Sequence, residues 1–134
     1  MTKHAGLGRF EVMAFVTVRD VDRARAFYRD VLGLRLLGEQ LPFALIFDAN
    51  GVILRVSIDR ESAPARGTVL GWRVQDIAAA VHDLAAAGVT LERYSFLQQD
   101  ENGIWSSPSG SRVAWFKDPD GNVLSVSQHP DRFS

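Results

Sequence analysis

Two stretches of the chain carry apolar residues at the spacing of an amphipathic helix. In residues 21–32 the apolar positions recur every three or four residues, which places them on one face, and Asp20 precedes them as an N-cap residue. Residues 77–87 repeat this pattern after Asp76. A glycine follows each stretch, as is common where a helix ends. The pattern therefore predicts helices over residues 21–32 and 77–87.

Short apolar runs, rich in branched and aromatic residues, predict strands between sequences typical of turns. Asn50-Gly51 is a strong two-residue hairpin signal, and Asp118-Pro119-Asp120-Gly121 marks another turn. The predicted strands cover residues 11–18, 34–37, 42–47, 52–56, 69–74, 89–94, 112–116 and 123–127. Together with the helices, they follow the order strand, helix, three strands, and this order occurs twice.

The two halves of this order also match in sequence. Residues 18–21 match residues 74–77 at a spacing of 56, and residues 51–54 match residues 121–124 at a spacing of 70. An internal duplication explains both matches, with an insertion in the second half. We predict a single α+β domain of two βαβββ modules over residues 1–134, with module one at about 11–57, a linker at about 58–68 and module two at about 69–128.

Composition and charge narrow the class of protein. The chain has 134 residues, of which 46% are hydrophobic and 23% are charged, so it has enough apolar residues to form a core. Its net charge of -1 and lack of basic runs argue against a nucleic-acid partner. The absence of cysteine excludes disulfides and thiolate metal sites. Without a signal peptide or an apolar run of about 18 residues, we expect a cytoplasmic protein with no membrane partner.

Three segments of the sequence resemble the vicinal-oxygen-chelate superfamily. They are VTVRDVDRARAFYRDVLGL at 16–34, WRVQDIAAAVHDLAAAGV at 72–89 and FKDPDGNVLSV at 116–126. This superfamily includes glyoxalase I, extradiol dioxygenases, fosfomycin-resistance enzymes and bleomycin-binding proteins. The resemblance implies two modules whose sheets curve into a cup, and it implies a homodimer, either side by side or with exchanged modules. Because the superfamily hosts several chemistries, the resemblance specifies the fold more closely than the activity.

Metal-dependent members of the superfamily take one metal ligand, a His, Glu or Gln, from each of four strands. The resemblance carries these positions onto Met13, Arg55, Val69 and Ser125. None of the four offers the imidazole nitrogen or carboxylate oxygen that such a site needs, and Arg55 adds a fixed positive charge. We therefore predict no metal, no other cofactor and no catalytic residue at these positions.

The alternation of side chains along a strand predicts which residues face the cup. The predicted lining is mostly apolar with a few polar groups, which is typical of a small-molecule pocket. Arg55 and Arg73 would bind a carboxylate or phosphate there, or would pair with acids such as Glu11, Asp59 and Glu92. Trp105, in the inserted loop, is expected to form a lid or a subunit contact. The predicted ligand-binding residues are Met13, Phe15, Thr17, Ile53, Arg55, Val69, Arg73, Trp105, Ser125 and Ser127.

Three hypotheses about function follow from these residues. The first is a metal-independent protein that binds an apolar or aromatic small molecule, anionic if the arginines contact it. The second is a glyoxalase-like lyase, isomerase or dioxygenase that uses residues outside the usual metal positions, which would require a titratable group in the cup. The third is a cup filled by its own side chains, with a role in assembly.

Overall fold

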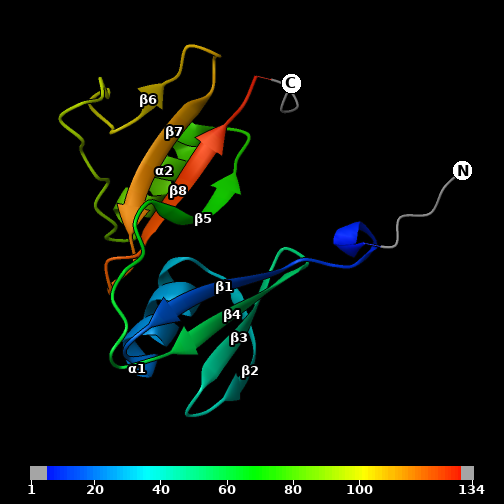
Figure 1. The fold of residues 1–134 in the computed structure, drawn as a ribbon. Coiled ribbons are helices and arrows are strands. Elements are labelled where there is room, and N and C mark those ends of the chain that lie inside the picture. The colour runs from blue at the N-terminus through cyan, green and yellow to red at the C-terminus, as the bar shows by residue number, and fades with distance from the viewer. Residues whose placement is uncertain (1–5, 131–134) are drawn as a thin grey trace, which may run out of the picture.

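The computed structural model describes residues 6–130 as two four-stranded sheets with helical segments packed against them (Figure 1). In chain order the elements are η1 (Leu7–Arg9), β1 (Met13–Val18), α1 (Val21–Arg25), η2 (Ala26–Val31), β2 (Arg35–Gln40), β3 (Ala44–Ala49), β4 (Val52–Ile58), β5 (Thr68–Arg73), α2 (Ile77–Ala86), β6 (Trp105–Ser106), β7 (Arg112–Lys117) and β8 (Val123–Gln128). The α+β fold of paired βαβββ modules is confirmed. Within residues 6–130, no helix has the length and apolar character needed to cross a membrane.

The first module forms a sheet in the order β1-β4-β3-β2, in which β1 is parallel to β4 and the other neighbours are antiparallel. The predicted hairpin between β3 and β4 is confirmed. Asn50 and Gly51 both have positive φ, 53° and 93°, as a tight two-residue turn of this type requires. This turn sets the register that places Arg55 opposite Ile46.

The second module repeats the topology in the order β5-β8-β7-β6, but one predicted strand is wrong. Residues 89–94 form no strand and pair with the sheet only through an isolated bridge between Leu91 and Phe116. The second strand of this module, which follows α2, is instead the two-residue β6, inside the predicted insertion. The side-chain amide of Gln99 explains the difference, because it binds the backbone N–H of Tyr94 and the carbonyl of Glu92 in place of a strand partner.

Both predicted helices are present, and each begins at its predicted cap. The Asp20 carboxylate accepts a hydrogen bond from the Asp22 N–H, and the Asp76 carboxylate accepts one from the Ala79 N–H. The first helix changes character along its length, because the α-helical α1 is followed by η2, a segment of wider π-helical turns. In η2 two successive aromatic residues, Phe27 and Tyr28, are both buried.

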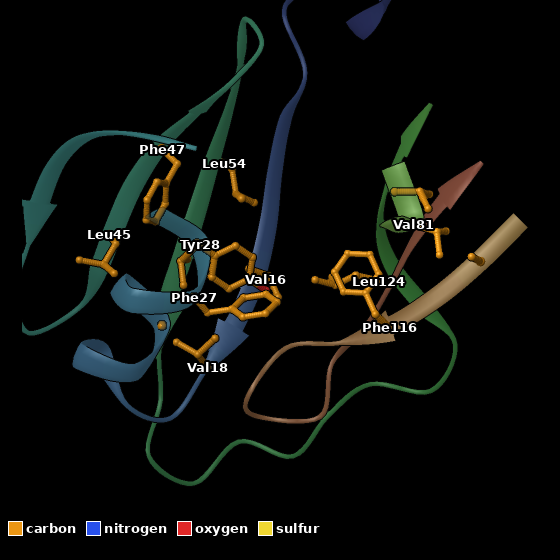
Figure 2. Packing of buried hydrophobic residues seen from close by; sticks show 14 of the residues in the cluster. Val16, Val18, Phe27, Tyr28, Leu45, Phe47, Leu54, Val81, Phe116 and Leu124 are labelled. Carbon is orange, nitrogen blue, oxygen red and sulfur yellow. The ribbon is translucent and has the colours of Figure 1, made fainter. Parts of the chain in front are cut away.

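One hydrophobic core joins the two modules. Buried side chains from β1, β3 and β4 belong to the same cluster as buried side chains from α2, β7 and β8. In Figure 2, Val16 and Phe27 lie between the sheets and face Phe116 and Leu124. α2 lies behind β7 and β8 in Figure 1, so it covers only one face of its sheet. We call the opposite, more exposed face of each sheet its cup face.

A buried polar cluster at the Asp118–Gly121 turn ties module two to module one. The Tyr28 hydroxyl donates a hydrogen bond of 2.7 Å to Asp118 Oδ2, and Asn122 Nδ2 donates one of 2.9 Å to the Thr17 carbonyl. Arg19 and Arg23 both pair with the buried Asp120 carboxylate. Burial and the Asp118 charge raise the pKa of Tyr28 above its usual range. These residues hold the modules together and leave the cup faces for other contacts.

Candidate ligand-binding site

The cup face of the first sheet carries the predicted residues in the predicted alternation. Met13, Phe15 and Thr17 alternate along β1 with residues that pack against or lie in the core. Across the parallel pair, Met13 lies beside Ile53, and Phe15 lies beside Arg55. Phe15 is 58% exposed, which is unusual for a phenylalanine in a strand and leaves its ring available for contacts. Apolar side chains and the Arg55 guanidinium therefore share this face, and Asp48 and Arg35 lie on it across the sheet from Ile53.

Arg55 pairs with an amide and not with an acid. Its Nη1 donates a hydrogen bond of 2.8 Å to Gln40 Oε1 at the end of β2. Within residues 6–130 no carboxylate lies within ion-pair distance of it, so the expected pairing with Glu11, Asp59 or Glu92 is absent for this arginine. Glu92 lies 3.6 Å from Lys117 instead. Gln40 orients the guanidinium without neutralising its charge, which suits a group that binds an anion.

The cup face of the second sheet holds Arg73, Ser125 and Ser127. Arg73 lies beside Ser127, and Gly71 lies beside Ser125, across the parallel pair of β5 and β8. A Cβ atom at Gly71 would lie 2.7 Å from Ser125 Oγ, so the absence of a side chain there makes room for that hydroxyl. Ser127 Oγ lies 3.0 Å from His129 Nε2, which fixes its orientation.

The predicted orientation of Val69 is wrong. The register of β5 shifts between Thr68 and Leu70, so Val69 is an extra residue in the ladder and packs against the hydrophobic core. Thr68 takes the position opposite Val123 on the cup face. A prediction from strict alternation cannot anticipate such a bulge, because one extra residue moves the preceding side chains of the strand to the opposite face of the sheet.

Trp105 belongs to a group of four aromatic side chains: Tyr94, Phe96, Trp105 and Trp115. The rings of Trp105 and Trp115 lie 6.1 Å apart, and the Tyr94 ring meets Trp115 edge to face at 5.5 Å. Tyr94 is also 5.6 Å from the Phe96 ring. Trp105 lies in β6, at the edge of the second sheet, and packs against Trp115. Its predicted role as a lid or subunit contact stays untested. Burial and the nearby Glu92 raise the pKa of the Tyr94 phenol.

Three residues of the two cup faces were not anticipated from the sequence. They are Gln40, which contacts Arg55 on the first sheet, and Tyr94 and Phe96, which belong to the aromatic group on the second. Gln40 follows the predicted strand 34–37, which in the structure extends to residue 40. Tyr94 and Phe96 lie where a strand was expected to end. The sequence does show Tyr94 and Phe96 two residues apart beside a polar loop. It does not show that they form an aromatic group, because that group depends on contact with Trp115, which lies about twenty residues further along the chain.

Comparison with known proteins identifies the family. The profile of the Glyoxalase/Bleomycin resistance protein/Dioxygenase superfamily matches residues 6–126. The chain belongs to this superfamily. No curated protein matches it.

Solved structures of the superfamily share its fold at low sequence identity. Lactoylglutathione lyase from Agrobacterium tumefaciens is 22% identical, with a TM-score of 0.68 over 87% of this chain and 92% of that chain. A glyoxalase family protein from Enterococcus faecalis is 19% identical, with a TM-score of 0.72 over 91% of this chain and 99% of that chain. The fosfomycin resistance protein FosX from Listeria monocytogenes is 12% identical, with a TM-score of 0.65 over 87% of this chain and 90% of that chain. At these identities the likeness shows the fold alone.

The superfamily includes metal-dependent enzymes, so the donor chemistry of the corresponding positions matters. Met13, Arg55, Val69 and Ser125 present a thioether, a guanidinium, an alkyl group and a hydroxyl. These groups do not fit a Zn²⁺, Ni²⁺, Fe²⁺ or Mn²⁺ site, which needs imidazole or carboxylate ligands. Within residues 6–130, no group of three or more His, Asp or Glu side chains is placed to hold a metal ion.

Proposed function

We propose that this chain is a metal-independent small-molecule binding protein of the glyoxalase/bleomycin-resistance type. The observation that carries the proposal is the residue set at the four usual ligand positions, together with the apolar side chains Phe15 and Ile53 beside them. The ligand is apolar or aromatic, and its anionic group, where it has one, pairs with Arg55. Arg55 supports this role because its hydrogen bond to Gln40 leaves its charge unneutralised.

The alternative, a lyase, isomerase or dioxygenase with unusual catalytic residues, has less support. It requires a titratable group beside the bound molecule. Asp48 shares the cup face of the first sheet, opposite Ile53, but its Oδ1 accepts a hydrogen bond of 2.8 Å from the Gly51 N–H. That carboxylate closes the hairpin turn, and the residue paired with Arg55 is an amide, which does not titrate.

Metal content and thermal unfolding test the proposed function. The protein is purified without chelator and analysed for metals, and its Tm is then followed with Zn²⁺, Ni²⁺, Fe²⁺ or Mn²⁺ and with a panel of aromatic and aliphatic carboxylates. We expect no stoichiometric metal, no Tm increase with the ions and an increase with at least one organic compound, because a ligand that binds the folded state stabilises it. A tightly bound stoichiometric metal ion would overturn metal independence.

We also propose that the chain forms a homodimer that covers part of the first cup face. Several large apolar side chains in the first module are exposed, and they are Phe10, Val12, Met13, Phe15, Leu37, Leu41 and Phe43. Exposed apolar surface of this extent is typical of an interaction surface. Sedimentation equilibrium should give about twice the chain mass of 14.8 kDa, and a monomer mass at micromolar concentration would overturn this assembly.

A cytoplasmic location and the absence of a nucleic-acid partner complete the proposal. The near-neutral charge of -1 supports the second point, because nucleic-acid binding relies on clustered positive charge. Cell fractionation and a filter-binding assay with DNA and RNA at low salt test the two points separately.

A further inference from the structure

A cleft on the cup face of the second sheet has an unusually aromatic lining. It has a volume of about 330 Å³. Its lining residues are Gly67, Thr68, Tyr94, Phe96, Leu97, Trp115 and Val123. None of these side chains is charged. The volume is at the low end of the range of roughly 300–1,000 Å³ for small-molecule sites, so it suits one ring or two fused rings.

The aromatic side chains form a connected wall along this cleft. Tyr94 stands nearly perpendicular to Trp115, with ring planes at 83°, and lies at 38° to Phe96. Phe96 is 80% exposed and makes no ring contact within residues 6–130 other than that with Tyr94. A flat ring in the cleft would add the same edge-to-face or offset contacts that the wall already makes internally. A saturated, puckered ring of equal size cannot make them.

Side-chain hydrogen bonds connect the wall to the loop that follows it. Gln99 Oε1 accepts from the Tyr94 N–H at 2.8 Å, and Gln99 Nε2 donates to the carbonyls of Glu92 and Gly103 at 2.9 and 2.8 Å. Arg93 donates to the carbonyls of Asp100 and Glu101, each at 2.6 Å. A segment that is not a strand is thereby kept in one conformation, and a preorganised site loses less entropy when a ligand binds.

We propose that this cleft is the part of the site that selects the ligand, and that it accepts a planar aromatic group of one or two rings. The inference rests on the proposed function and makes its ligand class specific. Tyr94, Phe96 and Trp115 contact the ring. The ring portion is uncharged because no charged side chain lines the cleft. An acidic substituent therefore lies outside the cleft.

Isothermal titration with two matched probes tests the proposal. The probes are 2-naphthoate and its saturated analogue decahydro-2-naphthoate, which have the same carbon count and charge and differ in planarity. We expect 2-naphthoate to bind about tenfold more tightly, since each aromatic contact contributes a preference of this order or somewhat less. Phe96→Leu and Tyr94→Leu should reduce the preference to less than about threefold. Leu7→Ala, which changes an exposed apolar residue of η1 outside the proposed interaction surface, is the control and should leave the preference unchanged.

The outcomes separate this proposal from the proposed function. Equal affinity for the two probes, or a preference that survives both substitutions, overturns the aromatic cleft while small-molecule binding stands. If no compound of the aromatic and aliphatic panel binds, small-molecule binding is wrong and the cleft proposal is wrong with it. If Phe96→Ser halves the sedimentation mass and the probes do not bind, the cleft is a subunit contact and the proposal is overturned.

Discussion

The hydroxyl of Tyr28 donates a hydrogen bond to the buried carboxylate of Asp118, and this contact joins two residues 90 positions apart. Asp118 is only 4% exposed, and it also accepts hydrogen bonds from the backbone of Asp120 and from Asn122. Its two carboxylate oxygens therefore accept hydrogen bonds from both modules. The strand-to-strand turn of module two thus packs directly against the helical segment of module one.

Tyr28→Phe should lower the free energy of unfolding by about 1–3 kcal/mol, because it removes a donor from a buried carboxylate. Urea unfolding followed by circular dichroism measures the change. Tyr94→Phe is the matched control, since the Tyr94 hydroxyl makes no hydrogen bond within residues 6–130, and it should change stability by much less. Equal effects of the two substitutions would show that the Tyr28–Asp118 contact contributes little.

Stability should fall at alkaline pH more steeply in the wild type than in Tyr28→Phe. Burial and the Asp118 charge raise the pKa of Tyr28 above 10.0, so the unfolded chain releases the phenol proton at a lower pH than the folded chain. The contribution is fully present below about pH 10 and decreases above it by about 1.4 kcal/mol per pH unit. Unfolding curves between about pH 9 and pH 11 test this. Parallel pH profiles for the two proteins would contradict it.

Arg55→Ala should weaken the binding of the panel carboxylate that raises the Tm most by roughly tenfold or more, since a hydrogen bond to a charged group contributes about 1.5–3 kcal/mol. Binding of the corresponding uncharged alcohol should stay unchanged, because the substitution removes the charge partner of the carboxylate. Arg66→Ala, at an exposed linker position, controls for the change in net charge. Isothermal titration gives all three affinities, and an unaltered affinity for the carboxylate would remove Arg55 from the site.

Gln99→Leu should loosen the aromatic wall without touching the ligand. The substitution leaves the Tyr94 N–H and the carbonyls of Glu92 and Gly103 without their partner, so we expect a loss of about 1–3 kcal/mol in stability. It should also reduce the preference for 2-naphthoate over its saturated analogue. Gln98→Leu, the exposed neighbour, is the control. If Gln99→Leu is less stable but keeps the full preference, Gln99 supports the fold and does not position the wall.

The order of elements follows from local signals in the sequence. The N-caps Asp20 and Asp76 and the turn Asn50-Gly51 act through their own backbone neighbourhood, so each can be recognised from a few residues. The facing of β1 also follows, because side chains alternate in any regular strand, and Met13, Phe15 and Thr17 lie on the predicted face. The non-ligand character of Met13, Arg55 and Ser125 needs only their identity and the repeat.

Other features depend on contacts between distant parts of the chain. The bulge at Val69 depends on how β5 pairs with β8, and the predicted strand 89–94 is replaced because the Gln99 side chain satisfies its backbone. Gln40 meets Arg55, and Tyr94 meets Trp115, only after the strands are paired. Local preferences are properties of short segments, whereas register, cross-strand neighbours and cleft shape arise from packing. The sequence therefore determined the modules and the chemistry of the strand positions, and the tertiary structure decided which side chains share a surface.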